Sequence, residues 1–202
     1  MLVYENFLAA ELADNIELNF LDNKFPWYYL NKSVDLPDVN GFINTALFRH
    51  SFILENELIS NYCNTINPIL QKIASIFSNQ IEIASVTANL VLPNSDLIGK
   101  YIIPHYDVKY DDSVYEKYKT YTGLYYVNDS DADTIIFKEK YGNIISSHTE
   151  VERVTPKKNK LVLWDSRTYH SAPASATSNR LVININFITN GSVAESGLLQ
   201  QS

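Results

Sequence analysis

The second part of the chain repeats one pattern, in which short β-branched and aromatic runs alternate with polar loops. The runs cover residues 81–92, 121–127, 135–137, 151–154, 161–164 and 181–188. Such runs, bounded by turn-forming residues, are typical of β-strands. Several short strands with no helical segments of comparable length between them favour a sandwich or a barrel. This half of the chain is therefore predicted to form an all-β core.

The first third of the chain adds two helices to this pattern. Residues 9–21 place apolar side chains four positions apart, which predicts an amphipathic helix. This apolar stripe consists of Leu12, Ile16 and Phe20. Asn67 and Pro68 predict the start of a second helix, because asparagine often caps a helix and proline is tolerated in its first turn. The buried face of the second helix would carry Ile69, Ile73 and Phe77.

Further strands are expected at residues 3–8, 25–30 and 41–48, and a return to helix is expected after Glu55. The resulting fold class is mainly β, with N-terminal helices packed on one face. A length of 202 residues fits a single domain. Within it, residues 1–78 supply strands and supporting helices, residues 79–190 form the β core, and residues 191–202 are expected to be a flexible tail.

Composition limits the partners and the location of the protein. The net charge of -7 makes nucleic acid an unlikely partner. No apolar run approaches the roughly 18 residues of a membrane span. A single cysteine, Cys63, and a start without signal-peptide features favour the cytoplasm. Abundant Asn, Ile, Lys and Tyr indicate an AT-rich genome, hence a microbial or virus-infected host cell. The sequence leaves the oligomeric state open.

Three residues suggest a metal site. His105 and Asp107 are two positions apart, and on a strand their side chains would point to one face. His170 follows the apolar run 161–164 and adds a second imidazole. Two neutral histidines and one carboxylate, with other positions open, suit a non-haem ferrous ion. The other histidines, His50 and His148, lack a carboxylate at strand spacing and are weaker candidates.

Arg180 opens the run 181–188, and on a strand it would share a face with Val182, Asn184 and Asn186. If this face lines a pocket, it places a guanidinium inside an apolar fold. A buried charge is costly without a partner, so an anionic group is expected beside Arg180. A dicarboxylic co-substrate suits it, since arginine binds a carboxylate through two parallel hydrogen bonds.

His105-x-Asp107, His170 and Arg180, in this order and spacing, resemble the iron(II)/2-oxoglutarate-dependent dioxygenases, and more narrowly their prolyl-4-hydroxylase-like branch from bacteria and phages. Three further stretches are similar to that branch and extend the resemblance over nearly the whole chain: Gly123-Leu-Tyr-Tyr-Val-Asn128, Leu163-Trp-Asp-Ser-Arg-Thr-Tyr-His170 and Tyr4-Glu-Asn-Phe-Leu8.

The resemblance implies a double-stranded β-helix, the jelly roll shared with cupins. His105, Asp107 and His170 would be the catalytic iron ligands, and Fe(II), 2-oxoglutarate and O2 would be required, with L-ascorbic acid as an associated expectation. Arg180 would hold the distal carboxylate of 2-oxoglutarate, helped by Tyr126. Leu124 would line the same wall, while Asn184 and Asn186 would make polar contacts.

The implied reaction is hydroxylation of a C–H bond, with release of succinate and CO2. The substrate would be a small molecule or a peptide, including a peptidyl proline or another protein side chain. Two alternatives stay open from the residues alone: a cupin-like metal-binding jelly roll with other chemistry, and a non-catalytic interaction module.

Two segments near the expected site depart from the family pattern or allow two roles. Residues 131–137 contain no glycine where many family members have a glycine-rich turn, so the resemblance does not specify the geometry of this hairpin. The charged and tyrosine-rich segment 109–119 follows Asp107 directly. It is either a solvated connection or a lid that helps to select the substrate.

Overall fold

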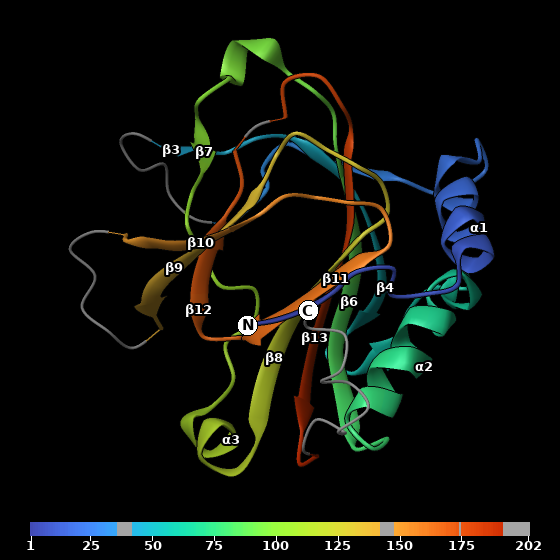
Figure 1. Cartoon of the computed structure of the whole chain (residues 1–202), viewed down its shortest axis with the longest axis vertical. Coiled ribbons are helices and arrows are strands. Elements are labelled where there is room, and N and C mark those ends of the chain that lie inside the picture. Colours follow the sequence, from blue (N-terminus) through green and yellow to red (C-terminus); the bar gives the residue numbers. More distant parts are fainter. Residues whose placement is uncertain (36–41, 142–147, 174, 192–202) are drawn as a thin grey trace.

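The computed structural model describes residues 1–35, 42–141, 148–173 and 175–191. Figure 1 shows a large sheet in the middle of the molecule, with two helices against one face and a smaller sheet on the opposite side. This arrangement is a jelly roll, so the predicted fold class is confirmed. The space between the two sheets is where a ligand would bind in such a fold.

The large sheet is antiparallel throughout. Its strand order is β1 (Leu2–Tyr4), β11 (Lys160–Asp165), β8 (Lys119–Tyr126), β13 (Arg180–Thr189), β6 (Ile81–Val91), β4 (Leu47–Leu54) and β2 (Tyr28–Leu30), with β5 (Glu57–Leu58) paired to β4. The longest strands, β6 and β13, lie side by side at its centre.

The small sheet has the order β10 (Glu150–Val154), β9 (Thr134–Lys140) and β12 (Thr168–Ser171). A two-stranded parallel pair, β3 (Phe42–Ile43) and β7 (Tyr101–Ile102), continues from it through an isolated bridge between Tyr101 and Pro173. The edge of the small sheet is therefore built by segments that lie far apart in the sequence.

The helices are α1 (Ala10–Leu21), α2 (Asn67–Ile76) and the short α3 (Asp112–Lys117), and two 3-10 turns are η1 (Cys63–Thr65) and η2 (Ser95–Leu97). Helices α1 and α2 cover the outer face of the large sheet (Figure 1). One apolar cluster joins Ile16 and Phe20 of α1 to Ile73 of α2, and to Ile183 and Phe187 of β13. Burial of these side chains holds the helices on the sheet.

Strand β13 serves both faces of the large sheet. The side chains that point to the helices are apolar and buried: Leu181, Ile183, Ile185 and Phe187. The alternate residues line a cavity between the sheets: Arg180, Val182, Asn184 and Asn186. The period-two alternation predicted from the sequence thus separates the core from the cavity along a single strand.

Several local predictions need correction. In α1 the buried stripe contains Ala13 rather than Leu12, which is 42% exposed. Helix α2 begins at Asn67 with Ile66 in the cap position, so Asn67 does not cap it. A strand pairing at β5 replaces the helix expected directly after Glu55, because Glu57 and Leu58 pair with β4. The expected tail falls mostly at residues 192–202, outside the described residues.

Three expected strands are shorter or divided. The first ends at Tyr4. The second keeps only Tyr28–Leu30. The third is split into β3 and β4, with Asn44 between them bonding the backbone of Ser33 and Val34. Among the described residues, no helix is long and apolar enough to cross a membrane.

Helix α1 offers a matched test of this packing. We expect Ile16→Ala to lower the free energy of unfolding by ~2–5 kcal/mol, because Ile16 is 3% exposed and its removal leaves a cavity against the sheet. Leu18→Ala in the same helix should change it by less than ~0.5 kcal/mol, since Leu18 is 64% exposed. Urea unfolding measures both; equal losses would contradict the assigned helix face.

Candidate metal centre and co-substrate pocket

The two candidate histidines are joined through their backbones. The His105 amide donates to the His170 carbonyl at 3.0 Å, and the His170 amide donates to the His105 carbonyl at 2.8 Å. Residues paired in this way in an antiparallel bridge carry their side chains on the same face. Their imidazole rings are 4.6 Å apart between centroids. The backbone pairing therefore brings the two rings together before any ligand is considered.

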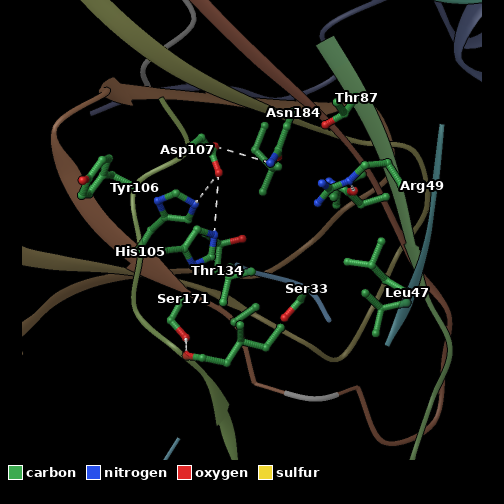
Figure 2. Close-up of a pocket in the computed structure, with 18 of the residues that line it drawn as sticks. Ser33, Leu47, Arg49, Thr87, His105, Tyr106, Asp107, Thr134, Ser171 and Asn184 are labelled. Atoms are coloured by element: carbon green, nitrogen blue, oxygen red, sulfur yellow. Dashed lines mark hydrogen bonds and ion pairs between the residues drawn. The ribbon is translucent and has the colours of Figure 1, made fainter. Parts of the chain in front are cut away.

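Asp107 completes the cluster, although not through a regular strand. His105 forms an isolated bridge and Asp107 lies in a bend, so the expected strand spacing is absent. Asp107 Oδ1 nevertheless lies 3.7 Å from His105 Nε2 and 3.6 Å from His170 Nε2. Figure 2 shows the carboxylate directed at both rings. One ligand atom from each residue lies within 4.8 Å of the others.

These donor atoms fit a ferrous ion. His105 Nδ1 bonds the Ile103 carbonyl at 2.8 Å, which leaves Nε2 as the free donor. Burial, with the neighbouring His170, lowers the pKa of His105 to about 4, so this imidazole is neutral near pH 7. Ligands of one octahedral ion lie roughly 3 Å apart, slightly closer than these donor atoms. Small side-chain movements would close the site around a metal.

The carboxylate of Asp107 is suited to the same role. Burial raises its pKa, but His170, His105 and Arg49 act more strongly together, so the net pKa lies below the ordinary value. Asn184 Nδ2 lies 3.4 Å from Asp107 Oδ2 and holds the oxygen that faces away from the histidines. Asp107 is thus an ionised carboxylate suited to bind a metal, and the contact with Asn184 would help to orient it.

A cavity of about 530 Å³ opens beside this cluster. It lies between the two sheets, and its wall includes His105, Asp107 and His170 together with the inward face of β13. The volume is in the range of small-molecule sites and exceeds what one five-carbon dicarboxylate needs. The cavity therefore has room for a co-substrate and part of a second molecule.

Arg180 lines this cavity and is 9% exposed. Its Nε donates to the Ala132 carbonyl at 3.1 Å, and its Nη2 donates to Thr134 Oγ1 at 2.9 Å. Burial lowers the pKa of Arg180, while Tyr126 and Asp133 oppose that shift. Across the described ranges, no carboxylate lies within ion-pair distance of this guanidinium. The two hydrogen bonds orient the guanidinium, but they do not neutralise its positive charge.

Thr134 links Arg180 to Tyr126. The Tyr126 hydroxyl donates to Thr134 Oγ1 at 2.7 Å, and both side chains are fully buried. Burial raises the pKa of Tyr126 to about 12, so the phenol stays neutral. Thr134 lines the cavity, whereas Tyr126 stands behind it. Sequence reasoning missed Thr134; its signal was a hydroxyl in the run 131–137, at the start of the strand that contains Phe137.

The hairpin without glycine is held by Asp131 instead. The carboxylate accepts bonds from the amides of Ala176 and Thr177 at 3.1 and 3.0 Å and from the hydroxyls of Ser175, Thr177 and Ser178. Although some burial raises the pKa of Asp131, these donors lower it well below the usual range. This network fixes the start of β9, where Ala132 and Thr134 hold Arg180.

The other predicted site residues divide between cavity and surroundings. Leu124 and Asn184 line the cavity. Asn186 also lines it, but its amide is engaged by Thr122 Oγ1 at 2.7 Å and Ser85 Oγ at 3.2 Å. The two remaining histidines lie outside the metal cluster, as expected.

His50 is bonded through both ring nitrogens, to the Pro26 carbonyl and Ser60 Oγ. His148 packs edge-on against Phe137 and Tyr169. The contacts of both histidines are therefore those of structural residues.

The segment 109–119, which is fully described, contains α3. Tyr115 of this helix accepts a hydrogen bond from the Tyr110 amide and lies under the Arg167 guanidinium at 5.3 Å. Among the described residues that line the cavity, none comes from this segment. Its role as a lid stays a prediction.

Sequence reasoning also missed a second cavity arginine, Arg49 on β4. Its Nε donates to Asn89 Oδ1 at 2.8 Å. Arg49 sits in the middle of the run Leu47-Phe-Arg-His-Ser-Phe52, and the alternation of that run is a signal that one face leaves the core.

Comparisons with known proteins agree with this geometry. Residues 95–188 match the family model described as the 2OG-Fe(II) oxygenase superfamily, a segment that includes all three candidate metal ligands and Arg180. The sequence has no significant match among curated proteins. The matched segment and the jelly roll together support similarity to the 2OG-Fe(II) oxygenases, a family that implies Fe(II), 2-oxoglutarate and O2.

Solved structures with low sequence identity share the fold. The epimerase SnoN of nogalamycin biosynthesis, in complex with Fe3+ and alpha ketoglutarate, matches with a TM-score of 0.61 at 12% identity, covering 93% of this chain and 78% of SnoN.

Two prolyl hydroxylases are also similar. The viral collagen prolyl hydroxylase vCPH from Paramecium Bursaria Chlorella virus-1 has a TM-score of 0.55 at 14% identity, over 93% and 94% of the two chains. A Pseudomonas putida prolyl-4-hydroxylase has a TM-score of 0.55 at 16% identity, over 93% and 91%.

The metal site can be tested by removing one imidazole. We expect His170→Ala to lose most of its bound iron while keeping the fold, because one of three ligands is deleted at the cavity surface. His148→Ala is the matched control and should keep its iron, since His148 lies outside the cluster. Iron content after anaerobic loading and circular dichroism are the measurements. Full iron content in His170→Ala would refute the assignment.

Proposed function

We propose that this protein hydroxylates a C–H bond of its substrate, with 2-oxoglutarate as co-substrate. The overall reaction consumes the substrate, O2 and 2-oxoglutarate, and yields the hydroxylated substrate, succinate and CO2. The observation that supports it best is Arg180, a buried guanidinium without a carboxylate partner in the described structure, in the cavity that holds the metal cluster. A buried charge of this kind is costly unless an anion neutralises it.

In this proposal each residue has a defined role. His105, Asp107 and His170 would hold Fe(II), which supplies activation of O2 when bound. Arg180 would bind the distal carboxylate of 2-oxoglutarate, oriented by Thr134, with Tyr126 fixing the Thr134 hydroxyl. Leu124 would form an apolar wall of the co-substrate pocket, and Asn184 and Asn186 would keep its polar side ordered. The apolar wall would limit water near the reacting atoms.

The substrate is proposed to be a small molecule or a peptide, with a peptidyl proline among the candidates because two similar structures are prolyl hydroxylases. SnoN, an epimerase, has the same fold, so hydroxylation itself needs a product measurement. Succinate release with Fe(II), 2-oxoglutarate and candidate substrates, followed by mass spectrometry, tests the reaction. A product that gains no oxygen would overturn the hydroxylase assignment. Cytoplasmic location and dependence on ascorbate stay predictions.

Substitution of Arg180 tests the co-substrate pocket. We expect Arg180→Gln to retain iron and to bind 2-oxoglutarate about ten- to a hundredfold more weakly, because hydrogen bonds to a charged group contribute ~1.5–3 kcal/mol. Anaerobic titration of the visible iron–2-oxoglutarate absorption band measures the affinity. An unchanged dissociation constant would place the distal carboxylate elsewhere.

Thr134→Val separates orientation from charge. The substitution keeps the shape of the side chain but removes the hydroxyl that bonds Arg180 and Tyr126. We expect a several-fold loss of 2-oxoglutarate affinity with iron binding unchanged, since the guanidinium remains but loses a fixed partner. Thr155→Val, on an exposed loop away from the cavity, is the control. If both variants bind 2-oxoglutarate like the unmodified protein, Thr134 has no positioning role.

A further inference from the structure

Arg49 is a second cation in the same cavity, and the co-substrate pocket does not require it. It lies on β4 opposite Asn89 of β6. Figure 2 shows its guanidinium directed into the cavity, across from His105 and Asp107. Its Nε is occupied by Asn89 Oδ1, but among the described residues no ion pair or further hydrogen bond engages its terminal nitrogens. These nitrogens are the forked end that binds carboxylates.

Arg49 and Arg180 occupy different walls. Arg180 on β13 is drawn toward β9 by Ala132 and Thr134. Arg49 lies two strands away from β13, beyond β6, and is held by β6. Neighbouring strands are about 4.8 Å apart, so the two side chains start from positions roughly 10 Å apart across the sheet. Two guanidinium groups on separate walls therefore face one cavity.

The balance of charges in the cavity indicates what Arg49 binds. In the proposed function the charge of Fe(II) would be balanced by Asp107 and one carboxylate of 2-oxoglutarate, and the charge of Arg180 would be balanced by the distal carboxylate of 2-oxoglutarate. Arg49 then remains as one uncompensated, partly buried positive charge. Asp35 also lines the cavity, but it is exposed and forms no ion pair with Arg49. Burial lowers the pKa of Arg49 and Asp107 only partly offsets this, so the position is costly without an anion.

We propose that Arg49, oriented by Asn89, binds a carboxylate of the primary substrate. The proposal rests on the proposed function and narrows it: the substrate is an acid whose carboxylate docks on the β4–β6 wall while its reactive C–H bond faces the metal cluster. Thr87, on the same face of β6 and lining the same cavity, offers a hydroxyl beside this position. A neutral substrate would leave Arg49 unneutralised in the complex.

The test uses the Zn(II)-loaded protein with saturating 2-oxoglutarate, so that no turnover occurs and the Arg180 pocket is filled. Sodium propionate is the probe and propionamide is its neutral isostere. We expect propionate to raise the melting temperature of the unmodified protein and propionamide to have no effect. Arg49→Met should lose the propionate shift, with at least about a tenfold loss of affinity. Lys138→Met, which removes an exposed lysine on β9, should keep it.

Two further measurements exclude other roles of Arg49. The affinity for 2-oxoglutarate should be unchanged in Arg49→Met; a loss would assign Arg49 to the co-substrate and overturn the proposal. The ligand-free melting temperature should stay equal or rise, because an unneutralised charge is removed. A large fall, with the propionate shift retained, would assign Arg49 a structural role instead.

Further ligands distinguish failure of the proposed function from failure of the Arg49 proposal. If 2-oxoglutarate does not stabilise the unmodified protein, the proposed function fails and this inference fails with it. If 2-oxoglutarate binds but propionate does not, the inference alone is wrong. Stabilisation by inorganic phosphate in place of propionate would also overturn it. A shift with N-acetyl-L-alanine as well as propionate would support a peptide C-terminus as the source of the carboxylate, and a shift with propionate alone would support a free small acid.

Discussion

The candidate metal centre depends on one pair of backbone hydrogen bonds, between His105 and His170. These bonds attach the segment after β7 to β12 and place two imidazoles on one face. Asp107 then needs only a bend in the chain to reach both rings. Because the pairing involves main-chain atoms, it brings the two histidine backbones together through bonds of their own. The candidate site is therefore organised by backbone pairing at the edge of the small sheet, and the side chains that could bind a metal project from this pairing.

Strand β13 connects this frame to the rest of the molecule. Its apolar face holds α1 and α2 on the large sheet, and its polar face supplies Arg180 and Asn184 to the cavity. Asn184 in turn contacts Asp107. Packing of the core and orientation of the site are therefore set by the same strand, and a register shift of one residue would exchange the two faces.

Much of this arrangement could be predicted from the sequence. The inward face of β13 follows from strict alternation after Arg180, and the candidate metal ligands follow from donor chemistry together with resemblance to a family. Thr134 and Arg49 could not be found in this way, because they meet the site only through strand pairings that the sequence does not display. Local errors had local causes. The apolar pattern of α1 did not distinguish Leu12 from Ala13, whose burial depends on how the helix is rotated on the sheet.

The turn at Asp131, beside the cavity wall, is held by a side chain rather than by a glycine. Where a glycine would shape a turn through its own backbone freedom, here a single carboxylate gathers the backbone and hydroxyl donors of residues 175–178. The turn and the segment before β13 are thereby one unit, since the same loop leads directly to Arg180. In evolutionary terms, the turn at Asp131 and residues 175–178 are expected to change together. A substitution in either stretch would alter the orientation of the Arg180 guanidinium in the pocket.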